Sequence, residues 1–175
     1  MKTGVGLFVL LLALPSVAQA PPADSIWIGP DRYVLLSLGQ PKDSVLRSLR
    51  EHFDLAGEET NEVYVSTAGC LLSECPGMVS FKQGRLSSVT KNWQIVGPDR
   101  DVAVVQAIRG AMSSFGTAGR TCSVQTFDHQ EPNVERSGVA VACGKRQVQI
   151  IDSRATFGGN TQEGVVVREV LSSEP

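Results

Sequence analysis

The sequence predicts an α+β fold, an antiparallel sheet with two amphipathic helices on one face. Two stretches, 41–55 and 98–115, carry apolar residues at the spacing of a helix. Each is followed by short runs rich in β-branched residues, with glycine-containing turns between them. Since each helix has one apolar stripe and each hairpin one apolar face, placing both helices on the same side of one sheet buries these surfaces.

The first twenty residues have the pattern of a secretory signal peptide. Lys2 provides a basic start, an apolar run covers residues 4–14, and Ala18 and Ala20 form an A-x-A cleavage pattern. A second small-residue site leaves cleavage after residue 18 or after residue 20 open. The apolar run is shorter than the roughly 20 residues of a membrane span. We therefore expect a periplasmic or secreted protein, with no transmembrane segment once the signal is removed.

Loss of residues 1–20 leaves 155 of the 175 residues, which suits one domain or two small ones. Because Lys2 leaves with the signal, the formal charge changes from −2 to −3. Charges of both signs are interspersed without a basic stripe, so we expect no nucleic-acid partner. The element order predicts a first module over residues 21–96 and a second over residues 97–175, which share one core.

The first module begins with two short apolar runs at residues 26–28 and 33–38, the second of which predicts a strand. Pro41 then opens a helix over residues 41–55, because proline fits the first helical turn. The apolar stripe of this helix consists of Val45, Leu46, Leu49 and Phe53.

A strand over residues 62–68 and a hairpin follow that helix. The hairpin joins residues 78–81 to 86–90 through Gln83-Gly84, where glycine supplies the positive φ of a two-residue turn. In this register Phe81 faces Leu86, and Val79 faces Ser88.

The second module repeats the order of helix, strand and hairpin. Its helix starts at Pro98, and the predicted stripe is Val105, Ile108, Met112 and Phe115. A strand over 122–127, a polar loop over 128–137, a hairpin joining 139–143 to 146–151, a second loop over 158–162 and a last strand over 165–171 follow. In that hairpin Val141 faces Val148, and Val139 faces Ile150. Phe53 and Phe115 stand at matching places, which predicts a tandem pseudo-repeat, although chance also explains so common an order.

The four cysteines all lie after the signal peptide. An even number of cysteines in an exported chain favours disulfides. Three pairings are open, and we prefer those within each module: Cys70–Cys75 and Cys122–Cys143. The C-x₄-C spacing is not that of a zinc knuckle, and only two histidines are present. We therefore expect neither a metal nor another cofactor.

Residues 36–93 combine a Leu-Gly turn, a helix and a glycine-centred hairpin. This stretch resembles the helix-plus-antiparallel-sheet module of small bacterial outer-membrane assembly lipoproteins, which β-lactamase inhibitory proteins carry in tandem. The matching residues are Gly39, Asp43, Val45, Leu46, Leu49, Phe81, Gly84, Leu86 and Trp93. All are structural in kind, and the cysteine that the lipoproteins acylate is missing. The resemblance implies a fold and an exported, protein-binding role, and it transfers no contact residue.

Candidate catalytic residues occur only at Asp128, His129 and Glu131. A histidine between two carboxylates can act as a general base, although a solvated loop is the simpler interpretation. None of the common nucleophile, metalloprotease or nucleotide-binding motifs is present.

Three aromatic residues, Trp27, Tyr64 and Trp93, are candidates for an interaction surface, because aromatic side chains often anchor interfaces. Burial in the core is the alternative. Together these features predict an exported, non-enzymatic module that binds another protein or a cell-envelope component. The alternatives are an inhibitor of an exported enzyme, a small exported hydrolase using His129, and a carrier of a small apolar ligand.

Overall fold

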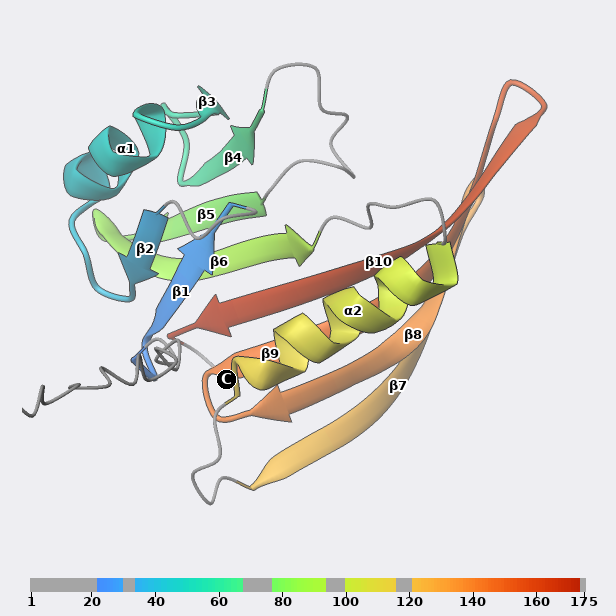
Figure 1. Cartoon of the computed structure of the whole chain (residues 1–175). Helices are drawn as coiled ribbons and strands as arrows, with labels where there is room; N and C mark the ends of the chain where they lie inside the picture. Colours follow the sequence, from blue (N-terminus) through green and yellow to red (C-terminus); the bar gives the residue numbers. More distant parts are fainter. Residues whose placement is uncertain (1–21, 30–33, 68–76, 94–99, 116–120, 174–175) are drawn as a thin grey trace, which may run out of the picture.

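A computed structural model of the whole chain describes residues 22–29, 34–67, 77–93, 100–115 and 121–173 (Figure 1). The elements in chain order are β1 (Ser25–Ile28), β2 (Val34–Ser37), α1 (Lys42–Arg50), β3 (Asp54–Ala56), β4 (Glu62–Ser66), β5 (Gly77–Lys82), β6 (Arg85–Trp93), α2 (Arg100–Ser113), β7 (Cys122–Glu131), β8 (Val134–Cys143), β9 (Arg146–Phe157) and β10 (Asn160–Ser172). The chain is thus a strand-rich α+β protein. The expected signal peptide and the Cys70–Cys75 pair lie outside the described residues.

Eight of the strands form one antiparallel sheet in the order β3-β4-β5-β6-β10-β9-β8-β7. Each helix is followed by four strands that run up and down in sequence. The last strand of each set, β6 and β10, pair with one another in the middle of the sheet. The remaining two strands, β1 and β2, form a separate antiparallel pair.

The register defines the two faces of the large sheet, because residues directly opposite one another in an antiparallel sheet point to the same side. We call one side the helix-bearing face. One of its rows crosses seven strands and consists of Val63, Val79, Val89, Leu171, Arg146, Cys143 and Cys122. We call the other side the open face. One of its rows crosses all eight strands and consists of Ala56, Tyr64, Met78, Thr90, Val170, Gln147, Ala142 and Ser123.

The larger hydrophobic core lies under α1 on the helix-bearing face. The buried side of the helix consists of Val45, Leu46 and Leu49. They join apolar residues of β4, β5 and β6, the β1–β2 pair and Leu171 of β10 in one cluster. Burial of one such aliphatic side chain contributes roughly 1.5–3 kcal/mol, so this cluster is a main source of stability for the first half of the chain.

The smaller core lies under α2, which contacts β10 and β9 on the same face (Figure 1). The buried stripe of α2 is Ala103, Ala107 and Ala111, four residues apart. The predicted stripe is therefore wrong for Val105 and Met112, which are 62% and 38% exposed.

Close packing explains the choice of small residues on α2. A Cβ atom on Gly110 would lie 2.6 Å from Cζ3 of Trp93 on β6, so the helix backbone sits directly against the indole ring. Larger side chains on this side of the helix would hold it away from the sheet. Ile108 and Phe115 are partly buried and pack at the side of the cluster.

Several predicted boundaries are wrong for local reasons. The first helix ends at Arg50 rather than at residue 55, and the chain continues into the short strand β3, which was not predicted. Phe53 is still buried, but from the connecting segment. The polar loop predicted over residues 128–137 is instead the end of β7, a two-residue turn and the start of β8. The loop predicted over residues 158–162 is mostly strand, because only the turn between β9 and β10 interrupts the ladder. These strand ends project beyond the core, so their polar side chains are solvated on a paired backbone.

Hairpin registers were predicted more accurately. Phe81 faces Leu86, and Gly84 has a positive φ, as expected; Gln83 also has a positive φ, which was not predicted. Val79 faces Val89 rather than Ser88, because a β-bulge between Ser80 and Phe81 shifts the ladder by one residue. In the second hairpin both predicted pairs are confirmed, Val141 with Val148 and Val139 with Ile150.

Candidate functional site

The open face is the largest feature of the sheet that the described helices leave uncovered. The members of the two core clusters that belong to the large sheet all lie on its helix-bearing face. The open face is nonetheless not uniformly polar. Its rows combine amides with apolar side chains that are at least partly exposed: Asn92, Gln125, Phe127, Gln147, Gln149, Val166 and Val170. Mixed surfaces of this kind are suited to protein contacts.

The charges on the open face have a consistent pattern. Arg168 lies on the central strand β10 and Arg136 on β8, next to the edge strand, whereas the register places carboxylates only on β3, β4 and β7, at Asp54, Glu62 and Glu131. Burial, and secondarily the charge of Arg136, lowers the pKa of Arg168. The Nε atom of Arg168 donates a hydrogen bond to Oδ1 of Asn92 at 3.2 Å. A carboxylate brought to this surface would therefore be attracted to two guanidinium groups.

Of the three predicted aromatic residues, only Tyr64 belongs to the open face, where it is 40% exposed. Trp27 is half-buried in β1. Trp93 is half-buried under α2 on the opposite face, and its Nε1 donates to Oε2 of Glu169 at 3.2 Å. The three residues do not form one surface. Phe127, which the sequence interpretation did not single out, is on the open face beside Gly138, where a Cβ atom would lie 2.8 Å from its ring.

The candidate catalytic residues lie near the end of β7. His129 and Glu131 point to one face and are joined at 2.8 Å, whereas Asp128 points to the other face. Both paired side chains are more than half exposed. The hydrogen bond and the charge of His129 lower the pKa of Glu131. An open hollow of about 260 Å³ adjoins Glu131, Arg154, Thr156 and Thr161. The pair lacks the water-excluded setting that makes a general base effective.

A buried polar centre connects the two halves on the helix-bearing face. Arg146 and Glu169 form an ion pair with side chains that are 1% and 2% exposed. A second Arg146 nitrogen donates to the carbonyl oxygen of Ser25 at 2.6 Å, which ties β1 to the large sheet. Lys91 lies opposite Glu169 in the ladder and 4.0 Å from the centre of the Trp93 ring. These contacts join β1, β6, β9 and β10. The buried polar centre therefore has a structural role.

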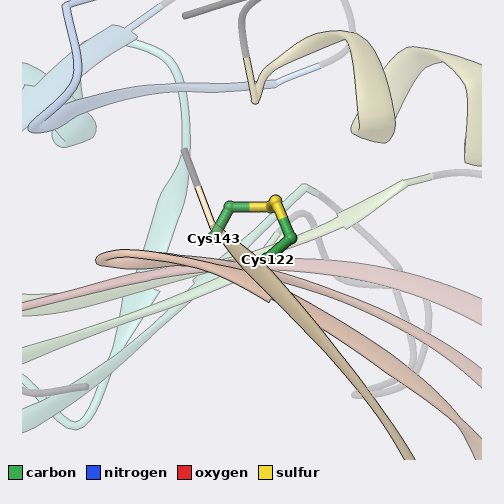
Figure 2. The surroundings of a disulfide bond; sticks show 2 residues. All are labelled: Cys122 and Cys143. Atoms are coloured by element: carbon green, nitrogen blue, oxygen red, sulfur yellow. A yellow bond between two sulfur atoms is a disulfide. The ribbon is translucent and has the colours of Figure 1, made fainter. Parts of the chain in front are cut away.

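The disulfide between Cys122 and Cys143 connects the start of β7 to the end of β8 (Figure 2). This preferred pairing is confirmed. The two residues are directly opposite in the ladder, with a Cα–Cα distance of 4.3 Å. The bond closes the whole β7–β8 hairpin and so fixes the edge of the sheet.

Within the described residues, no three histidine, cysteine, aspartate or glutamate side chains lie close enough together to hold a metal. A second open hollow of about 330 Å³ adjoins His52, Phe53 and Asp54. No helix in the described part of the chain is long and apolar enough to cross a membrane. Comparison of the chain with protein-family models, with curated proteins and with solved structures finds no match.

Proposed function

We propose that this chain is an exported, non-enzymatic module that binds another protein, or a protein component of the cell envelope, through its open face. The observation that supports the proposal is the continuity of this face across eight strands, with amide and apolar side chains in its centre. The partly desolvated Arg168 favours a partner with an acidic surface, because an incoming carboxylate would offset its burial and its repulsion by Arg136.

The proposed export rests on the N-terminal pattern and the disulfide. Disulfides persist in oxidising compartments such as the periplasm or the extracellular space. We further propose that the chain contains two tandem copies of a helix followed by a four-stranded meander. The element order of the two halves and the pairing of their last strands support this duplication. In such an arrangement both halves contribute to one binding face.

A more specific form of the proposal is an inhibitor that places the open face on an exported enzyme. The disulfide and the continuous ladder hold this face rigid, and a preorganised surface loses less entropy on binding. No nucleic-acid partner is proposed, because Arg168 and Arg136 are not part of a basic stripe on the open face.

Capture from an envelope extract of the source organism tests the proposal when two charge reversals are compared. Arg168→Glu alters the centre of the open face. Arg109→Glu, at an exposed position of α2, is the control. We expect the unchanged chain and the control to capture the same partner protein in equal amounts, and Arg168→Glu to capture at least tenfold less of it. Equal capture by all three chains would contradict binding through the open face.

The inhibitor form is tested by titrating the chain against a panel of exported hydrolases. Inhibition that Arg168→Glu abolishes, and that Arg109→Glu leaves unchanged, would support it. Hydrolytic activity of the chain itself that disappears in His129→Ala would instead overturn the non-enzymatic assignment.

A further inference from the structure

Among the strands that the structure describes, β7 is an edge of the large sheet and pairs with β8 alone. It is ten residues long, and every side chain on it except the half-buried Phe127 is exposed. The opposite edge is formed by β3, which has only three residues. Short edges resist pairing with other strands, whereas a long exposed edge is a template for it. The long edge β7 can therefore pair with another strand, whereas the short edge β3 resists such pairing.

The register shows which backbone groups of β7 face outward. The short Cα–Cα distance of 4.3 Å between Cys122 and Cys143 marks a pair whose N–H and C=O groups point away from one another. Alternate residues repeat this orientation along an unbroken ladder. Val124, Thr126, Asp128 and Gln130 consequently direct their N–H and C=O groups toward the open edge. These groups match those that a further strand would use.

β7 also lacks the devices that usually prevent edge pairing. It contains no proline and no lysine, and its pairing with β8 shows no bulge. Val124 is 67% exposed on the helix-bearing side. The negative charges, Asp128 and Glu131, are confined to one end.

We propose that β7 pairs antiparallel with β7 of a second copy of this chain, which joins two sheets into one. The charges favour this occupant and this direction. Antiparallel pairing places the acidic end of each strand beside the uncharged end of the other, whereas parallel pairing would bring the same carboxylates together. In an antiparallel pair, residues that direct their N–H and C=O groups toward the other strand lie opposite one another. Even-numbered residues of one β7 must therefore face even-numbered residues of the other.

Among the allowed registers, the one with its twofold axis at Phe127 gives both carboxylates a hydroxyl neighbour. Thr126 then lies opposite Asp128 of the second copy, and Ser123 lies opposite Glu131 of the second copy. The two Phe127 rings meet on the open face, and aromatic cross-strand pairs are favourable. Nine residues of each strand, 123–131, are paired in this register.

The oligomeric state of the oxidised mature chain tests the proposal by sedimentation velocity over a range of concentrations. We expect a dimer, and we expect Thr126→Pro to be monomeric. Proline removes an N–H that faces the open edge, so the β7–β8 ladder is kept. Thr126→Val, which retains the N–H, is the control and should remain dimeric. A monomeric parent chain, or an unchanged dimer in folded Thr126→Pro, would overturn the proposal.

A charge pair tests the register without removing a backbone donor. Thr126→Glu places a carboxylate beside Asp128 of the second copy and should weaken the dimer roughly tenfold, because the contact occurs twice by symmetry. Thr126→Lys should preserve or strengthen it. Equal weakening by both substitutions would contradict this register. Hydrogen exchange provides a separate measurement on the parent chain, since the outward N–H groups of β7 should become protected as concentration rises, and unchanged exchange would contradict pairing.

Discussion

Replacement of Glu169 by glutamine should destabilise the chain strongly, because it leaves the Arg146 guanidinium buried without a counter-charge. The two side chains are 1% and 2% exposed, so solvent cannot take over the role of the carboxylate. Removal of one partner from a buried ion pair costs about 3–5 kcal/mol. We expect about 3 kcal/mol, since the glutamine oxygen can still accept a hydrogen bond. This is a large part of the roughly 5–15 kcal/mol that stabilises a typical domain.

Urea denaturation of the oxidised chain measures this change as a lower midpoint with an unchanged slope. The melting temperature should fall by roughly 6–12 °C, at about 2–4 °C per kcal/mol for a chain of this size. Glu163→Gln is the matched control, because Glu163 pairs with Arg154 at 2.7 Å while both side chains are more than half exposed. That substitution should change the free energy of unfolding by less than about 1 kcal/mol.

The double variant Arg146→Met/Glu169→Leu separates the cost of an unpaired charge from the value of the pair. Because the buried guanidinium is removed together with its partner, we expect it to be more stable than Glu169→Gln alone, although the buried Lys91 opposite Glu169 keeps its charge. Loss of the hydrogen bonds to Ser25 and Trp93 keeps it below the parent chain. A loss below about 1 kcal/mol for Glu169→Gln, or a double variant less stable than the single one, would refute the reasoning.

Three further changes have measurable consequences. Cys122→Ser/Cys143→Ser should lower the free energy of unfolding by about 3 kcal/mol, since the bond closes a loop with a sequence separation of 21, and denaturation would show it. Gly110→Ala should destabilise despite the better helix propensity of alanine, because overpacking against the indole costs about 1–3 kcal/mol against a propensity gain of about 1 kcal/mol; a rise in melting temperature would contradict this. His129→Ala should raise the pKa of Glu131 toward its ordinary value, as followed by NMR titration. Since the pKa of Glu131 is lowered in the folded chain, its contribution to stability is present above the ordinary carboxyl pKa and is lost as the pH falls through the lowered value.

The sequence predicted the structure best where apolar residues recur with one clear spacing along a segment. The alternation around Gly144 predicted the pairs Val141–Val148 and Val139–Ile150, because both faces of that hairpin differ in polarity. The helix α2 shows where such reasoning ends. Its large apolar residues form a stripe at helical spacing, yet its small residues face the sheet. Which stripe is buried depends on the closeness of Trp93, a residue that lies outside the helix.

The candidate site could be predicted only in part. Sequence placed Asp128, His129 and Glu131 in a loop because they are polar, whereas backbone pairing with β8 holds them in a strand. The open face could not be identified in advance, because it combines residues from strands far apart in the chain. Arg168 and Arg136 are brought together only by the order β10-β9-β8. A surface assembled by strand order leaves no local pattern in the sequence.

The central position of β10 has a consequence for how the chain folds. This strand is the last of the described elements in chain order, yet it lies between β6 and β9 and contributes Leu171 to one core cluster and Val167 to the other. Neither cluster can close until β10 is available, so contacts of long sequence separation control the folding rate. For a chain that we propose to be exported, this order postpones the closing of both cores until β10 has been made, which favours passage of an unfolded chain across the membrane.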